Sequence, residues 1–283
     1  MLYLLLLIIT FAAFNLSFRQ AQRLGLNLHL TGVFLYLAGG LMFLVLHRLA
    51  PAPLSQTVIV LALVAGVLFT GMYVLMIPTM SDRGVSLMTA LQQLSVLVPM
   101  AASLVIYHEH PSTIAAVGAG LCLVAMPFLA LDRGVSGAGL TARKLTMFVG
   151  LMVINGVALT AAKVFDEMKV PEQLNGYMSL LMFTAAAVCL PFGVVSVRRG
   201  PQVRYGATTV GWGAYLGLLL ALGQLFMLLS LRHYPGVVVY PLCQASNVSL
   251  VTLVSLLAWR ERPGALGFVG IALAVIAIVL VNL

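Results

Sequence analysis

The chain has 283 residues, of which 62% are hydrophobic and only 8% are charged, and its mean hydropathy is +1.10. Soluble domains are about 45–50% apolar, so this composition excludes one and indicates a protein of the lipid bilayer. The formal net charge is +8, but the 15 lysines and arginines are scattered over the connections between apolar runs. Because they form no basic face on a solvated domain, we expect no nucleic-acid partner.

Ten apolar segments follow one another along the chain, and none of them contains Asp, Glu, Lys or Arg. Each has about 17 to 25 residues, enough for a helix to cross a hydrocarbon core of roughly 30 Å. The first segment lacks a basic n-region and a small-residue cleavage site, so we interpret it as a span and not as a signal peptide. The sequence therefore predicts an all-α membrane protein with ten transmembrane helices. Their approximate ranges are 2–18, 28–46, 57–77, 84–107, 112–131, 145–162, 175–197, 207–231, 235–259 and 264–282.

A long internal repeat divides the chain. Residues 84–131 return 152 positions later as residues 236–283 without a gap, and 13 of the 48 aligned positions are identical. The rarer residue types carry the repeat, because Val, Leu and Ala match easily by chance in so apolar a chain. The matching pairs of these types are Gly84 with Gly236, Gln92 with Gln244, Ser103 with Ser255, Glu109 with Glu261, Pro111 with Pro263 and Gly118 with Gly270. We expect two five-helix repeats, in residues 1–140 and 141–283.

The number of spans per repeat fixes their relative orientation. Five is odd, so the second repeat enters the membrane from the opposite side and the repeats are inverted. The connections after the odd-numbered spans hold 11 lysines and arginines, and the other side holds 4, which together make the 15 in the chain. Because cytoplasmic connections carry the excess of basic residues, we expect a multi-pass protein of the cell's inner membrane with both termini outside the cytoplasm.

Uncharged polar residues line one face of spans four and nine. Gln92 and Ser95 lie three positions apart in span four, and Tyr240, Gln244 and Asn247 have helical spacing in span nine. Gln244 and Asn247 are the repeat counterparts of Gln92 and Ser95. Two such stripes in helices of opposite orientation predict a substrate-binding site near the midplane, where amides offer donors and acceptors without a charge. The alternative is that these groups join helix to helix.

Four further polar residues are candidates for the wall of this site, at weaker spacing: Asn15, Tyr73, Asn155 and Gln224. Lys163 closes span six. A lysine there is expected to extend to the lipid headgroups, or else to meet a substrate carboxylate at one mouth of the cavity. Tyr36 and Tyr177 lie near span ends and are typical of interfacial aromatic belts.

Glu109 and Glu261 each stand two residues before a proline that opens the next span. A carboxylate at a helix N-terminus is stabilised by the helix dipole and the free N–H groups, so we interpret both as structural residues at helix starts. The sequence around Glu109 offers no further ligand for a metal, and we expect no metal and no cofactor. There is also no phosphate loop and no nucleophile with a base at a plausible spacing, so we do not expect an enzyme.

Two stretches of the repeat resemble a known family. They read SLVIYHE at 103–109, followed by Gly118, and SLLAWRE at 255–261, followed by Gly270. They are similar to the end of span four, the glutamate, the turn and the glycine of span five in EamA-type domains of the drug/metabolite transporter superfamily. The resemblance implies an inverted-repeat carrier whose central cavity, lined by spans one, three, four, six, eight and nine, opens alternately to each side. Members of the family carry amino acids and other small metabolites, and some carry quaternary amines or nucleotide-linked sugars.

The absence of a carboxylate within the spans narrows the expected solute. A desolvated cation needs a charged partner, so the cavity should suit a neutral or zwitterionic, amino-acid-like metabolite. A quaternary amine held by aromatic faces is an alternative, as is a lipid or lipid-linked sugar moved by a flippase. Proton antiport and facilitated diffusion both stay open. The expected partners are a small-molecule substrate and the bilayer, and the chain could act as a monomer.

Overall fold

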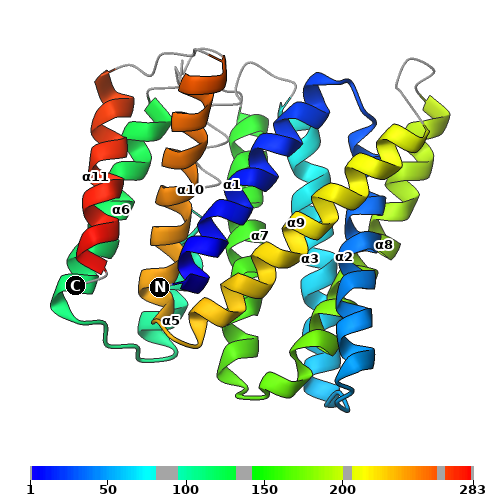
Figure 1. The fold of residues 1–283 in the computed structure, drawn as a ribbon, viewed down its shortest axis with the longest axis horizontal. Coiled ribbons are helices and arrows are strands. Elements are labelled where there is room, and N and C mark those ends of the chain that lie inside the picture. The colour runs from blue at the N-terminus through cyan, green and yellow to red at the C-terminus, as the bar shows by residue number, and fades with distance from the viewer. Residues whose placement is uncertain (1, 81–94, 132–141, 200–205, 260–264, 282–283) are drawn as a thin grey trace. The chain divides into compact units, whose positions relative to one another are not determined.

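The computed structural model describes residues 2–80, 95–131, 142–199, 206–259 and 265–281, and the regular elements in these ranges are helices (Figure 1). The elements in chain order are α1 (Leu2–Arg23), α2 (Leu28–Leu49), α3 (Gln56–Met80), α5 (Leu97–Val105), α6 (Thr113–Leu131), α7 (Ala142–Glu167), the 3-10 helix η1 (Pro171–Gln173), α8 (Leu174–Arg199), α9 (Ala207–Leu231), α10 (Gly236–Trp259) and α11 (Ala265–Val281). An all-α fold, as predicted, therefore holds for the described part of the chain.

Each of the ten predicted segments overlaps a helix, although the first part of span four, 84–94, lies outside the described residues. The predicted and observed limits coincide for α9. The difference that matters for the site is in α7, which continues from the predicted end at residue 162 to Glu167. No glycine or proline interrupts residues 163–167, and Pro171 comes only after the helix has ended, so helical geometry persists. This extension places Lys163 inside the helix.

Among the helices in the described ranges, five are long and apolar enough to cross a membrane. They are Leu2–Arg23, Leu28–Leu49, Gln56–Ile77, Pro171–Val197 (η1 with most of α8) and Ala207–Leu231. A bilayer core of roughly 30 Å requires about 20 residues of helix, which each of them supplies. The protein is therefore a helical chain with several segments suited to a membrane.

The described helices form two compact units. Unit 1 contains residues 1–12, 78–163 and 226–283, and unit 2 contains residues 13–77 and 164–225. Neither unit is one of the halves 1–140 and 141–283 expected from the repeat, because each unit combines segments from both halves. The boundaries of the two compact units therefore differ from the boundary between the two predicted repeats.

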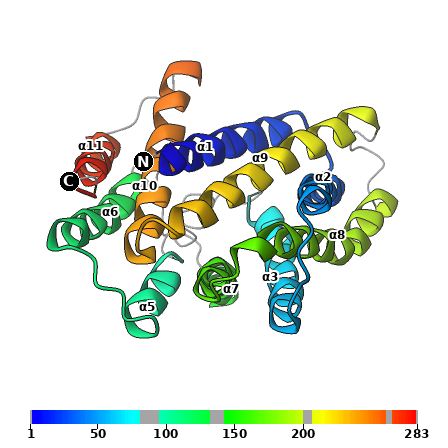
Figure 2. The ribbon, with the colours of Figure 1, turned by 60° about the horizontal axis from the view of Figure 1, so that its bottom comes forward.

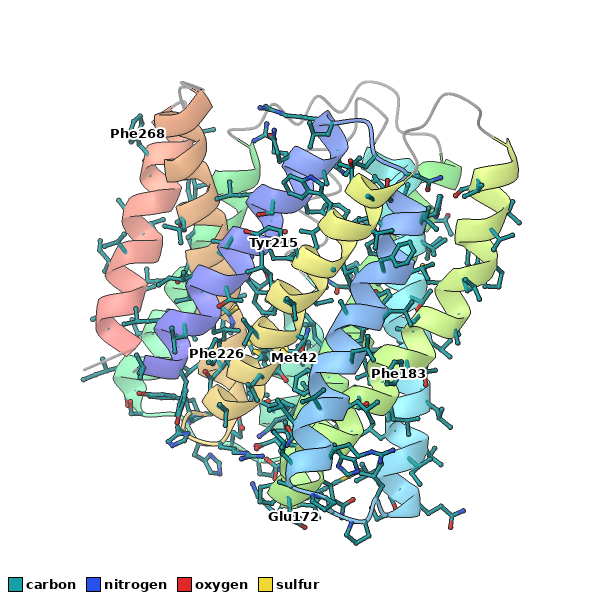
Figure 3. All side chains as sticks on the ribbon, turned by 45° about the vertical axis from the view of Figure 1, so that its right-hand side comes forward. Met42, Glu172, Phe183, Tyr215, Phe226 and Phe268 are labelled. Carbon is teal, nitrogen blue, oxygen red and sulfur yellow. The ribbon has the colours of Figure 1, made fainter. Side chains whose placement is uncertain are left out.

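In unit 2, α2 packs along α8 through small residues (Figure 2). A Cβ atom on Gly40 of α2 would lie 3.1 Å from the ring of Phe183, which Figure 3 labels on α8. The hydroxyl of Ser179 donates to the carbonyl of Gly40 at 3.3 Å. From α3, the hydroxyl of Thr70 donates to the carbonyl of Ala185 at 2.8 Å. Small residues and backbone carbonyls therefore bring these helices close together.

Two tyrosines complete the interior of unit 2. The hydroxyl of Tyr36 donates to the carbonyl of Phe69 at 3.1 Å, and that of Tyr73 donates to the carbonyl of Leu28 at 2.7 Å. The two rings meet edge to face with their centroids 5.8 Å apart. Tyr36 and Tyr177 are each only 1% exposed, so the expectation that they belong to interfacial belts is wrong. Both have partners inside the protein, since Tyr177 stacks on Phe165.

In unit 1, α6 packs along α11, and α10 contacts α5, α6 and α11. Figures 1 and 2 both show α6 beside α11, and in Figure 1 α6 rises where α11 descends. Phe268 of α11, labelled in Figure 3, is 55% exposed and lies on the outer side of this pair. Inside unit 1, the start of α1 and the end of α11 lie at the same end, where α5 also ends and α10 begins (Figure 1).

Candidate functional site

A polar cluster lies where α5, α7 and α10 meet in unit 1. It begins with a turn at the end of α5, where His108 has φ 50°. This left-handed conformation is uncommon for a residue other than glycine. It lets the N–H of Glu109 donate to the carbonyl of Ser103 at 3.1 Å. The chain therefore turns back at the helix end and directs Glu109 toward α10.

The carboxylate of Glu109 caps the start of α10. Its Oε1 accepts from the N–H of Gly236 at 3.0 Å, and its Oε2 accepts from the N–H of Val237 at 3.1 Å. The first N–H groups of a helix have no partner within the helix, and they carry the positive end of its dipole. An anion is stabilised there by both effects.

Lys163 of α7 completes the cluster with a buried positive charge. Its Nζ lies 2.6 Å from Oε1 of Glu109, and the two side chains are 3% and 13% exposed. The same Nζ lies 5.4 Å from the centre of the Tyr107 ring, a distance at which a cation and a ring attract each other. A lysine this deeply buried requires a counter-charge, since desolvation of an unpaired ammonium costs several kcal/mol.

The surroundings of Glu109 change its acidity. Burial by itself would raise the pKa of this carboxyl, but the hydrogen bonds from Lys163, Gly236 and Val237 and the lysine charge outweigh it, so the pKa lies below the ordinary value of 4.5. The carboxylate is therefore charged at neutral pH.

Three further contacts join α7 to its neighbours in the same unit. The hydroxyl of Tyr240 donates to the carbonyl of Leu159 at 3.2 Å, one turn before Lys163. The amide of Asn155 donates to the hydroxyl of Ser95 at 2.6 Å, and Gly156 lies against Val98, where a Cβ atom would be 2.5 Å from the valine side chain. The missing side chain at this glycine permits the close approach of the two segments.

The predicted substrate-binding residues are divided between the two units. Unit 1 contains Ser95, Asn155, Tyr240, Gln244 and Asn247. Ser95 is brought onto Asn155, and Tyr240 is only 1% exposed, whereas Gln244 and Asn247 are half-buried on α10. Gln92 lies outside the described residues. Asn155 pairs with Ser95, and Tyr240 pairs with the carbonyl of Leu159, so each of these side chains has a partner within unit 1.

Unit 2 contains the other three predicted residues, Asn15, Tyr73 and Gln224. Asn15 is exposed on α1, whereas Gln224 is 6% exposed on α9. Tyr73 is 3% exposed, donates to a backbone carbonyl and touches the rings of Phe18 and Tyr36. Its hydroxyl therefore has a partner within the protein.

The two expectations about charged residues need correction. Lys163 does not extend toward headgroups but is buried against Glu109, because α7 continues past the predicted end of span six. Glu109 is at a helix start, but the helix it caps is α10, distant in sequence, and not α6, which follows it. Glu261 lies outside the described residues. The described part of the chain holds no group of three or more His, Cys, Asp or Glu residues that could bind a metal.

Gly236 and Val237 were not predicted as site residues, although the repeat singles them out. Both are identical to their repeat counterparts Gly84 and Val85, and a helix that begins with glycine leaves its first N–H groups accessible to a side chain. Sequence alone does not show which carboxylate reaches them, because that depends on tertiary packing.

The fold is similar to that of 27 chains from solved structures. One of them, described only as the crystal structure of a protein, matches with a TM-score of 0.76 at 17% identity, and the match covers 99% of this chain and 98% of that one. At this identity the similarity shows the fold alone. No protein-family model matches the chain, and no curated protein does.

Proposed function

We propose that the chain is a secondary transporter that moves a small neutral or zwitterionic, amino-acid-like metabolite across the inner membrane by alternating access. In this proposal it has ten transmembrane helices in two inverted five-helix repeats, as in EamA-type carriers of the drug/metabolite transporter superfamily. Five helices with the length and apolarity of membrane spans support a multi-span protein.

One observation carries the proposal: two helices of the first half, α2 and α6, each pack against the helix that corresponds to them in the second half. Shifted by the repeat offset of 152, α2 falls on α8, and α6 falls on α11. Among the described helices these two pairs make the most extensive contacts, and in each pair the helices run in opposite directions (Figure 1). An element that packs against its own counterpart is expected when a two-fold axis relates two copies. For copies of opposite orientation, that axis lies in the membrane plane, which is the architecture of many secondary transporters.

The chemistry of unit 1 supports the proposed class of solute. Its predicted binding residues are amides and hydroxyls, which hydrogen-bond a polar solute without requiring a charge. The described charged pair, Lys163 with Glu109, lies near one end of the helices and is internally neutral. A solute with equal numbers of positive and negative groups, or with none, fits these surroundings better than a multivalent cation.

Counterflow in proteoliposomes tests the function. Vesicles loaded with one unlabelled amino acid at a time should accumulate the same labelled amino acid, and a thermal-stability screen of the purified protein should identify the same solute. Gln244→Ala should abolish the ligand-dependent stabilisation and leave the fold intact. Gln56→Ala, at an exposed position at the start of α3, is the matched control and should change neither.

Three outcomes would count against this proposal. No counterflow for any neutral or zwitterionic solute would contradict the function. Movement of labelled lipid across the bilayer in place of counterflow would favour a flippase. An unchanged response in Gln244→Ala would remove α10 from the binding site.

A further inference from the structure

Four identical positions of the repeat meet in the polar cluster of unit 1. Ser103 and Glu109 come from the first half, and Gly236 and Val237 come from the second half. Ser103 is 0% exposed, and its hydroxyl has no hydrogen-bond partner. A Cβ atom on Gly236 would lie 2.5 Å from Oγ of Ser103 and 3.5 Å from Oε2 of Glu109. The unsatisfied hydroxyl therefore lies beside the start of α10, next to the carboxylate.

Lys163 breaks the symmetry of the repeat at this place. Its counterpart, 152 positions earlier, is Phe11. Capping a helix requires only an acceptor at the first N–H groups, and a carboxylate there is already stabilised by the helix dipole. A buried lysine adds a desolvation cost that capping does not need. A buried hydroxyl without a hydrogen-bond partner is also unfavourable, because it has lost its hydrogen bonds to water. The cluster therefore has one hydrogen-bond donor, the hydroxyl of Ser103, that Glu109 leaves unpaired, and a buried positive charge that capping does not require.

We propose that Lys163, the N–H groups of Gly236 and Val237, and the hydroxyl of Ser103 form a carboxylate-binding site. Glu109 fills this site in the present structure as an internal ligand, and the carboxylate of the transported solute fills it when Glu109 leaves. The inference rests on the proposed transport function and adds to it that the solute is a carboxylate. The site lies beside Tyr107, whose ring contacts the lysine.

The placement of the groups makes such an exchange feasible. Lys163, Gly236 and Val237 are on helices, whereas Glu109 is on the connection between α5 and α6, held by the turn at His108. If a second carboxylate replaces the first, Lys163 keeps a counter-charge and the first N–H groups of α10 keep an acceptor. The exchange therefore avoids the large cost of a buried, unpaired charge.

Chemical rescue tests the site directly. Glu109→Ala should lower the melting temperature of the purified protein, and acetate should raise it again in a concentration-dependent way. Acetamide and chloride at the same concentrations should have a much smaller effect, because the first has no charge and the second lacks two oxygen acceptors. In the double variant Glu109→Ala, Lys163→Met, acetate should stabilise no more than chloride does.

Acetate that stabilises Glu109→Ala no better than chloride, or that stabilises the double variant equally, would overturn the inference. If Glu109→Ala does not fold, Ser103→Ala in the otherwise intact chain provides a second measurement, because it removes a hydroxyl that has no hydrogen-bond partner in the present structure. It should raise KM for an amino acid by at least tenfold and leave KM for the corresponding amino-acid amide unchanged.

Equal changes of KM for the acid and the amide would contradict the carboxylate site while leaving the transport function standing. A wild-type protein that transports neither compound would contradict the transport function. The acetate rescue would then still report whether the carboxylate site exists.

Discussion

The two units share hydroxyl-to-carbonyl hydrogen bonds and close packing at glycine, but the described contacts of unit 1 add a buried charged pair. In unit 1, α7 and α10 are joined through a charged pair, Lys163 with Glu109, and through N–H groups that a side chain caps. In unit 2, α2 and α8 are joined through Gly40 against Phe183, and through hydroxyls that donate to backbone carbonyls.

The charged pair of unit 1 differs from the packing contacts of unit 2 in one respect: a ligand in solution can supply one of its two groups. A carboxylate on a connection can be replaced by another carboxylate, whereas a ring packed on a glycine has no soluble substitute. Close packing of small and large residues fixes helices in one arrangement. In our proposal, unit 2 is therefore the scaffold and the charged cluster of unit 1 is the site that responds to a ligand.

The largest effect is expected from Lys163→Met. The change leaves the Glu109 carboxylate mostly buried without its counter-charge, and breaking a buried pair costs about 3–5 kcal/mol. The free energy of unfolding in detergent should fall by an amount of this order. Lys169→Met is the control, because Lys169 is 71% exposed and lies 3.6 Å from Glu167, and an exposed pair contributes about 0–1 kcal/mol. Equal losses of unfolding free energy in the two variants would show that the buried pair contributes no more to stability than the exposed pair does.

A packing defect in unit 2 should have the next largest effect. Gly40→Val places carbon atoms against the ring of Phe183, 3.1 Å from the position of the new Cβ, and overpacking costs about 1–3 kcal/mol. Gly71→Val, where a Cβ atom meets nothing within 4 Å, is the matched control and should change the unfolding free energy much less. Acetate should rescue neither variant. Tolerance of Gly40→Val would mean that α2 and α8 can separate.

Acid should weaken unit 1 through Glu109. The folded-state pKa of this carboxyl lies below its ordinary value of 4.5, so its contribution to stability is complete above 4.5 and is lost as the pH falls through the lower folded value. The difference in unfolding free energy between the wild type and Glu109→Gln should be constant from neutral pH down to 4.5 and shrink below it. A difference in unfolding free energy that grows on acidification would contradict a lowered pKa of Glu109 in the folded protein.

The smallest effect is expected from Tyr36→Phe in unit 2. It removes the hydroxyl that donates to the carbonyl of Phe69, and such a bond between membrane helices contributes about 0.6 kcal/mol. This loss should not depend on pH in the acid range, since a phenol does not titrate there. Tyr215→Phe is the control, because the Tyr215 ring is 48% exposed and its hydroxyl lies 3.4 Å from that of Ser17. A loss in Tyr36→Phe that exceeds that of Lys163→Met would reverse the comparison of the two units.

The sequence by itself determined the positions of the helices. Apolar runs bounded by charges and breakers predicted α9 to the residue and most other described helices to within about five positions, because helix length and apolarity are local properties; α5, which begins at Leu97 within the predicted span 84–107, is the exception among the described helices. The continuation of α7 to Glu167 was missed, since the prediction ended the span at the first charge. The repeat likewise came from sequence, through identities of Gly, Ser, Glu and Pro at one offset.

Only the tertiary structure decided which of these residues meet. Glu109 caps a helix that begins 127 residues later, and Lys163 reaches it from a third helix. Tyr36 has the position of an interfacial residue but is buried, because its hydroxyl finds a carbonyl on α3. Helical periodicity shows which residues share a face of one helix, but not which helix that face contacts. A buried charge and its partner therefore become visible only when the helices are packed together.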